Sequence, residues 1–135
     1  LCFAARRESV GIEKTYRLFE QGRIAVSHAL QSSSDELWFG LEFNLMIISG
    51  QRPLVNGEVM EHDRGRYFSD RVELKDDTAG ARLSITSDAR WDICVVPIEC
   101  ISQSEEGFEK TFQGWSIYWM RKSEGAIPEI VLEVH

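Results

Sequence analysis

Apolar and polar residues alternate along much of this chain, and this alternation limits the possible folds more than any other feature of the sequence. The longest alternating run spans residues 37–47, and its apolar phase is Leu37, Phe39, Leu41, Phe43, Leu45 and Ile47. Shorter runs with the same period occur at residues 24–30, 81–86, 115–120 and 130–134. A period of two is the pattern of a β-strand that buries one face. The runs therefore predict amphipathic strands.

Turn residues separate these runs at the spacing of hairpins. The expected turns and polar loops lie at residues 21–22, 32–35, 56–57, 76–80 and 123–125. Asn56-Gly57 is a strong turn signal, because both residue types tolerate the positive φ angles of a tight hairpin. No helical period longer than two turns is visible. Seven or more strands joined in this way predict an all-β fold, an antiparallel β-sandwich, as a single domain over residues 1–135.

Residues 91–98 are an exception, because both phases of this run are mostly apolar. A strand of this kind is covered on both faces. We expect it either at the centre of the sandwich or against another part of a longer protein. Pro97 has no N–H for a sheet hydrogen bond, so a bulge or a strand end is expected there.

The charge balance argues against two classes of partner. The chain has 135 residues and a net charge of −7, with 22 acidic against 15 basic side chains. Binding to nucleic acid or to anionic lipid requires a basic face, so neither a nucleic acid nor a membrane is an expected partner. No apolar run reaches the roughly 18–20 residues that a membrane-spanning helix needs.

The first residues and the cysteines bear on origin and compartment. In residues 1–7 the two arginines follow the apolar residues, which reverses the order of a secretory signal. The chain also lacks an initiator Met, so we interpret it as a piece of a longer protein. Cys2, Cys94 and Cys100 make an odd count without a C-x-x-C motif, which favours a reduced, cytoplasmic setting.

The sequence predicts neither a metal site nor a cofactor site. His28, His62 and His135 are scattered, and no two of them have the spacing of metal ligands. His28 lies in the apolar phase of its strand, so we interpret it as a core histidine whose hydrogen bonds are satisfied. No phosphate-binding glycine motif is present.

Residues 97–114 carry the most specific motif in the chain. They read Pro-Ile-Glu-Cys-Ile-Ser-Gln-Ser-Glu-Glu-Gly-Phe-Glu-Lys-Thr-Phe-Gln-Gly. The motif resembles the signature of the C-terminal β-domain of the α-amylase/4-α-glucanotransferase group in glycoside hydrolase family 57, with Phe112 in place of a Tyr. Residues 39–45 are similar to a Phe-Gly-Val-Glu-Phe-Asn-Leu strand of the same domain, and residues 77–83 fit a looser pattern. The resemblance spans residues 12–134.

This resemblance implies a fold, a role and partners. The fold would be part of a galactose-mutarotase-like supersandwich, in the C-terminal part of a larger multidomain enzyme. The catalytic carboxylates of that group belong to a separate barrel, so no catalytic residue is expected here. The implied role is a non-catalytic domain of an α-glucan-processing enzyme that braces the catalytic barrel, with maltodextrin or another maltooligosaccharide as a further candidate ligand. Two alternatives stay open: an autonomous carbohydrate-binding module, and a small sugar-acting enzyme.

Six side chains are candidates for carbohydrate binding: Trp38, Glu42, Asn44, Gln103, Glu105 and Trp115. Indole rings stack on the C–H faces of sugars, and carboxylates and amides hydrogen-bond sugar hydroxyls. Each candidate also has a structural alternative. The tryptophans can supply core area, and the strand residues Glu42 and Asn44 can satisfy neighbouring backbone groups. Residues 103–105 can stabilise a turn or contact the barrel.

Overall fold

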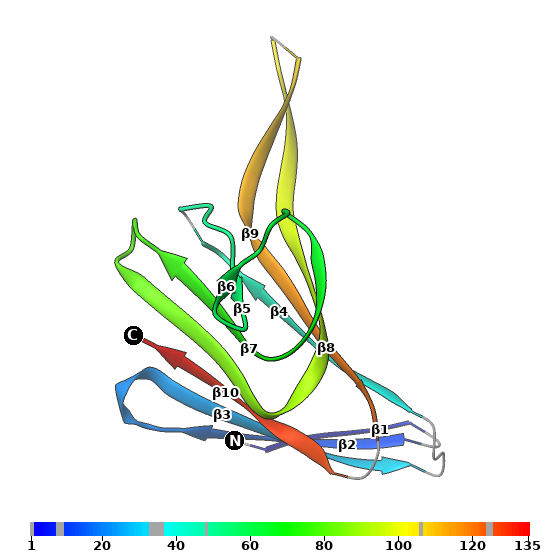
Figure 1. Ribbon diagram of the computed structural model, residues 1–135. Helices are drawn as coiled ribbons and strands as arrows, with labels where there is room; N and C mark the ends of the chain where they lie inside the picture. The colour runs from blue at the N-terminus through cyan, green and yellow to red at the C-terminus, as the bar shows by residue number, and fades with distance from the viewer. Residues whose placement is uncertain (1, 8–9, 33–36, 48, 106, 124–125) are drawn as a thin grey trace.

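The computed structural model describes residues 2–7, 10–32, 37–47, 49–105, 107–123 and 126–135 and is dominated by β-structure (Figure 1). Its strands are β1 (Cys2–Arg7), β2 (Val10–Leu18), β3 (Arg23–Ser32), β4 (Trp38–Leu45), β5 (Leu54–Val55), β6 (Glu58–Val59), β7 (Gly65–Asp76), β8 (Ala81–Ser104), β9 (Gly107–Lys122) and β10 (Ile127–Val134). A short 3-10 turn, η1 (Glu20–Gly22), joins β2 to β3. The pairings between these strands are antiparallel. The predicted all-β class is confirmed.

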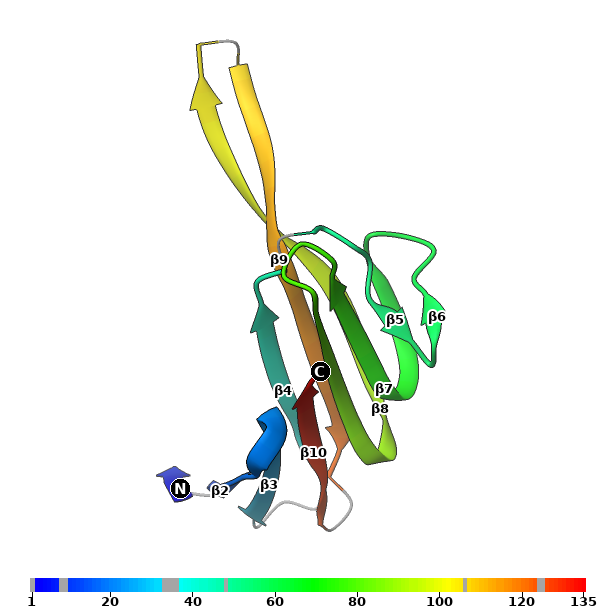
Figure 2. The same cartoon turned by 90° about the vertical axis from the view of Figure 1, so that its left-hand side faces the viewer.

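The β8 strand is 24 residues long and belongs to two layers. Residues 83–87 of β8 pair with β10, whereas residues 92–104 pair with β9. One layer therefore runs β1-β2-β3-β10-β8, and the other runs β8-β9-β4. The β7 strand pairs with both halves of β8 and borders both layers (Figures 1 and 2). Nothing in the described part of the chain is a helix with the length and apolarity to cross a membrane.

The two layers face each other across an apolar core, as in a β-sandwich. The rings of His28 on β3 and Phe39 on β4 lie 4.9 Å apart, although these two strands are not paired. Trp91 and Trp119 meet edge to face with ring centroids 6.0 Å apart, and both are buried. The predicted antiparallel sandwich is confirmed by this packing. The narrower mutarotase-like label stays a prediction.

The double-sided apolar run at residues 91–98 lies in the centre of the fold, between β7 and β9. Trp91, Ile93 and Val95 point into the core and are fully buried, while the alternate residues are partly exposed. The central position therefore matches one of the two placements expected from the sequence. Pro97 itself pairs in regular register with Trp115, so β8 neither ends nor bulges there. The register shifts one residue farther on, between Ile98 and Glu99, where the extra residue is Gln113 of the partner strand β9.

Three predicted turns have the expected backbone. Positive φ angles occur at Gln21 and Gly22, and again at Asn56 and Gly57, where β5 turns into β6. The Asp76 carboxylate accepts hydrogen bonds from the backbone N–H groups of Thr78 and Ala79 in the turn to β8, at 3.0 and 3.1 Å. Residues 33–36 and 124–125, from the other two predicted loops, lie outside the described residues.

The far ends of β8 and β9 leave the body of the sandwich as a single twisted hairpin (Figures 1 and 2). This projecting hairpin comprises residues 98–104 and 107–114, which pair with each other from Ile98↔Gly114 to Ser104↔Gly107. Almost the whole motif at residues 97–114 thus forms one element. Sequence patterning predicted strands only up to residue 98 and from residue 115 on, so the two strands of the projecting hairpin were not predicted.

Candidate functional site

Three of the six candidate residues lie together on the outer face of β4. Trp38 is 67% exposed, and Glu42 and Asn44 are also exposed on the same face. Alternation along β4 produces this arrangement, because its other phase, including Phe39, points into the sandwich. The outer face of β4 therefore presents an aromatic ring beside polar groups.

Glu42 is the centre of a hydrogen-bonded network on this face. Its carboxylate accepts hydrogen bonds from the Tyr118 hydroxyl, from Asn44 Nδ2 at 3.2 Å and from Ser116 Oγ at 3.1 Å. These bonds, first that from Tyr118 and then those from Asn44 and Ser116, lower the pKa of Glu42 below its usual value. Ser116 and Tyr118 are on β9 directly opposite Asn44 and Glu42. Neither partner could be predicted from the sequence, because only the register of β4 and β9 brings Ser116 and Tyr118 beside Glu42.

Trp115 is buried, which contradicts its prediction as a carbohydrate-binding residue. It is 2% exposed, its indole N–H donates to the Gln51 carbonyl at 2.9 Å, and the Phe112 ring packs against its edge. Both ring faces are covered by protein, so no sugar can stack on them. The structural alternative for this tryptophan is the correct one.

Gln103 and Glu105 lie at the tip of the projecting hairpin, and both are exposed. Asn44 pairs with Ser116, whereas Gln103 pairs with Phe108, eight residues farther along β9. At roughly 3.3 Å per residue, the tip is about 25 Å from the Glu42 network. A retaining glycosidase holds its two carboxyl groups only about 5 Å apart, and an inverting one less than about 10 Å. Glu42 and Glu105 are therefore not a glycosidase pair.

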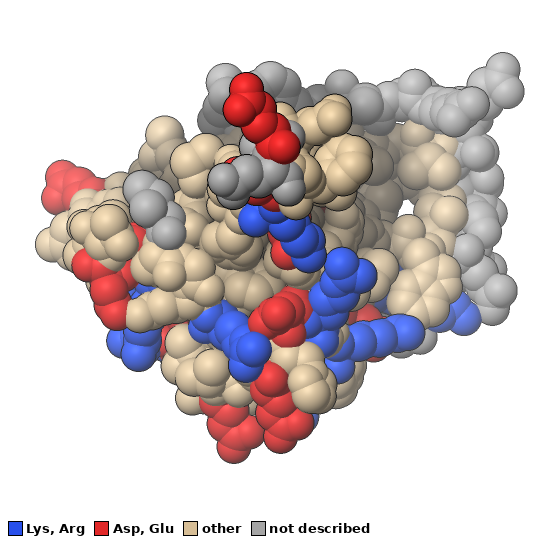
Figure 3. Space-filling model, turned by 90° about the horizontal axis from the view of Figure 1, so that it is seen from above, with Lys and Arg blue, Asp and Glu red and all other residues tan. Residues whose placement is uncertain are grey.

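The projecting hairpin also exposes large apolar side chains that sequence analysis had left unassigned. Ile101 is 73% exposed and Phe108 is 79% exposed. Both lie on the same face as Glu99 and Lys110, whose side chains form an ion pair at 2.5 Å. Seen from above (Figure 3), basic and acidic side chains intermingle over this end of the molecule instead of forming a field of one sign. The signal in the sequence was the presence of Ile101 and Phe108 within residues 99–110, which are mostly polar.

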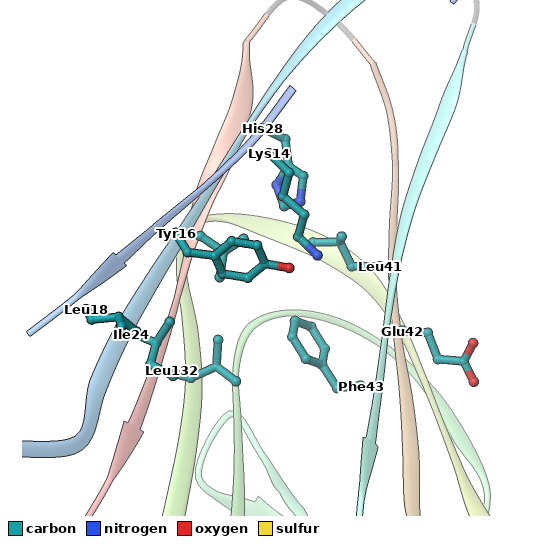
Figure 4. A pocket seen from close by; sticks show the side chains of 10 residues that line it. Lys14, Tyr16, Leu18, Ile24, His28, Leu41, Glu42, Phe43 and Leu132 are labelled. Atoms are coloured by element: carbon teal, nitrogen blue, oxygen red, sulfur yellow. The ribbon is translucent and has the colours of Figure 1, made fainter. Parts of the chain in front are cut away.

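A second feature is a groove of about 460 Å³ between the two layers, on the side where β4 faces β2 and β3 (Figure 4). We call it the interlayer groove. Most of its lining is apolar and includes Ile24, Leu41, Phe43 and Leu132. Three polar side chains also line it: Lys14, Tyr16 and His28. Glu42 borders the groove, but its carboxylate points away from it.

His28 is in the core, as predicted, but its hydrogen bonds are not satisfied. The residue is 7% exposed, and neither Nδ1 nor Nε2 has a hydrogen-bond partner among the described residues. Burial, aided by the Lys14 ammonium, lowers the pKa of His28 to about 4. The imidazole is therefore neutral at physiological pH, with one N–H donor and one acceptor nitrogen available.

Comparison with known proteins identifies relatives of this chain. The family described as "Alpha-amylase/4-alpha-glucanotransferase, C-terminal" matches residues 3–127. The 4-alpha-glucanotransferase of Thermococcus kodakarensis is 31% identical over 116 residues, which are 86% of this chain and 16% of that protein. The crystal structure of 4-alpha-glucanotransferase from Thermococcus litoralis has the same fold, with a TM-score of 0.72 and 22% identity over 92% of this chain. This chain spans 18% of that structure and so less than a fifth of either relative.

Proposed function

Since the chain belongs to the family of α-amylase/4-α-glucanotransferase C-terminal domains, we propose that it is a non-catalytic domain bracing the catalytic part of a longer α-glucan-processing polypeptide. We call that longer chain the parent polypeptide. The observation that carries this proposal is the projecting hairpin with exposed Ile101 and Phe108. The short coverage of both relatives supports it, because most of each relative lies outside the matched segment.

The physics of the hairpin favours docking. An isolated two-stranded hairpin is only marginally stable in water. Here the strands extend beyond the core, and their exposed face includes an isoleucine and a phenylalanine. Burying each of these side chains contributes about 1.5–3 kcal/mol. Contact with the catalytic part would therefore both order the hairpin and fix the position of the domain.

A chimera tests this role. In the T. kodakarensis enzyme, the segment that this chain matches is replaced by the present 135 residues. We expect the double variant Ile101→Ser/Phe108→Ser to lower the unfolding temperature and transferase activity of the chimera. The same variant in the isolated chain has little effect, because both side chains are already exposed there. The bracing role is contradicted if the double variant lowers the unfolding temperature of the chimera and of the isolated chain equally, or changes neither. Val59→Ser, at an exposed residue on β6, is the matched control.

The outer face of β4 supports a second candidate function, the binding of an α-linked glucan. Trp38 provides the exposed ring, and the Glu42 network provides fixed hydrogen-bonding groups on the same face. Titration with maltoheptaose, followed by tryptophan fluorescence and calorimetry, should show saturable binding that Trp38→Ala abolishes. Phe19→Ala, at an exposed ring on the turn after β2, should leave the affinity unchanged. Equal binding of a cellooligosaccharide, or no binding at millimolar maltoheptaose, rejects this candidate.

A further inference from the structure

The interlayer groove exists because the two layers end at different places. Beyond β3, the first layer continues into β2 and β1. The second layer ends at β4, whose pairing partner in the described chain is β9. The inner face of β2 and β3 therefore stands opposite a position beside β4 that no described strand occupies.

Both surfaces at this position are suited to an added strand. The outer edge of β4 carries backbone N–H and C=O groups of the kind that pair readily with another extended segment. Leu41 and Phe43 point into the groove from β4, and Ile24, Val26 and Leu132 line its opposite wall. Strands within a sheet are about 4.8 Å apart and facing sheets about 10 Å apart. A segment paired with β4 would thus lie over β2 and β3 and bury these apolar side chains.

The polar groups of the groove indicate the chemistry of the segment. Lys14 on β2 is directly opposite His28 on β3, and the two side chains lie together at one end of the groove. The Lys14 ammonium also lies 4.9 Å from the centre of the Tyr16 ring. Ion pairs among the described residues do not include Lys14, and both His28 nitrogens lack partners there. A carboxylate at this end would accept hydrogen bonds from the ammonium and from the neutral imidazole.

From this arrangement we infer that an extended segment of the parent polypeptide, outside these 135 residues, pairs with the free edge of β4 and fills the interlayer groove. Its inward side chains are apolar, apart from one Asp or Glu that binds Lys14 and His28. Most of each relative lies outside the segment that this chain matches, and a strand of this kind could come from a corresponding part of the parent polypeptide. This inference shares the premise of a parent polypeptide with the proposed function, but it concerns a different surface from the projecting hairpin.

A peptide-binding experiment on the 135-residue chain tests the inference. The probes are fluorescent peptides, each long enough to form one strand, tiled over the part of T. kodakarensis 4-alpha-glucanotransferase that this chain does not match. We expect one peptide or one overlapping set to bind, with alternating apolar residues and a single inward carboxylate. Binding should slow amide exchange in β4. Replacing that carboxylate by the corresponding amide, or making Lys14→Glu in the chain, should weaken binding about tenfold or more, the loss expected for a charge-assisted hydrogen bond.

Control variants distinguish peptide binding in the interlayer groove from peptide binding at the projecting hairpin. Lys75→Glu, which changes a lysine on β7 outside the groove, should leave peptide affinity unchanged, as should Ile101→Ser/Phe108→Ser. Lys14→Gln provides a milder second variant, and circular dichroism verifies that each variant is folded. The inference is wrong if no peptide binds at millimolar concentration or if binding protects only the hairpin. It is also wrong if the free chain dimerises through β4, or if octanoate fills the groove while no peptide does.

Discussion

Gly114 shows how one residue can fix the point at which the projecting hairpin leaves the sandwich. It pairs with Ile98 beside the register shift between β8 and β9, and the backbone at the end of β4 passes directly against it. A Cβ atom at this position would lie 2.1 Å from the Leu45 carbonyl oxygen. The obstacle is backbone rather than the end of a flexible side chain, so it cannot easily move away. The glycine at the end of the motif therefore has a packing reason independent of any ligand.

Gly114→Ala should destabilise the chain by about 3 kcal/mol, at the upper end of the cost of overpacking, because β9 and the segment after β4 must separate. Urea unfolding followed by circular dichroism measures this change. Gly11→Ala is the matched control, since its new Cβ would lie at ordinary contact distance, 3.5 Å, from Gln31. Similar effects for both variants would show that the close approach to Leu45 is unimportant.

His28 should make stability depend on pH. Its pKa in the folded chain is about 4, below the usual 6.5, so the unfolded chain binds the proton more readily. The contribution of His28 to stability is therefore fully present above pH 6.5 and is lost as the pH is lowered from 6.5 to 4, by at most about 3 kcal/mol. Unfolding measured across this range should show the loss in the unmodified chain but not in His28→Phe. His62→Gln, at an exposed histidine, should retain the loss.

At the level of single strands, the part of β8 inside the sandwich and the part in the projecting hairpin have different surroundings. Residues 91–95 of β8 are flanked by β7 and β9 and pack on the core, whereas residues 99–104 pair with β9 alone. The two regions belong to the same strand, but only the first is held by tertiary contacts. Local opening of the hairpin can therefore occur without unfolding the sandwich.

Amide hydrogen exchange, measured by NMR, should separate these two regions. We expect amides at residues 101–104 to exchange roughly a hundredfold faster, or more, than those of Trp91, Ile93 and Val95, because opening the hairpin uncovers little buried apolar area. Amides of residues 65–69 of β7, which pair with residues 91–95 of β8, serve as an internal reference for global unfolding. Uniform protection along β8 would mean that the hairpin is part of the cooperative unit.

At the scale of the whole molecule, shared strands and a common core make the two layers one unit. Trp91 on β8 contacts Trp119 on β9 and Phe39 on β4, while its indole N–H donates to Ser87 Oγ at 3.0 Å. Ser87 in turn donates to the Glu129 carbonyl of β10. This chain of contacts extends from one layer to the other through a single buried side chain.

Trp91→Ala should reduce the free energy of unfolding by about 3–5 kcal/mol, because it removes a buried aromatic side chain and its hydrogen bond. Far-ultraviolet circular dichroism and tryptophan fluorescence should report the same unfolding midpoint, since both layers lose the contact together. Trp38→Ala, which removes an exposed ring, should change stability by less than about 0.5 kcal/mol. Separate transitions in the two signals would show that the layers unfold independently.

Local patterning was sufficient for the alternating strands and the described turns, but it did not predict the strands at residues 2–7 and 107–114. The alternation of residues 37–47 correctly placed Phe39 inward and Trp38, Glu42 and Asn44 outward, because successive side chains of a strand point to opposite faces. Asn56-Gly57 formed a turn for an equally local reason, its tolerance of positive φ angles. The motif at residues 97–114 also indicated the family.

Pairing between distant segments decided the rest, because a local period carries no information about which strands become neighbours or where a layer ends. The alternation of residues 115–120 does not show whether the face that includes Trp115 is exposed or buried. In the structure, the segment after β4 covers Trp115. Gln103 and Glu105 were candidates for the same kind of ligand as Glu42, but the β8–β9 register places them beyond the core, far from Glu42. Likewise, the groove around His28 arises only because β4 ends one layer while β2 extends the other. Local alternation decides which side chains of a strand share a face, whereas pairing between distant segments decides which faces meet and which remain open.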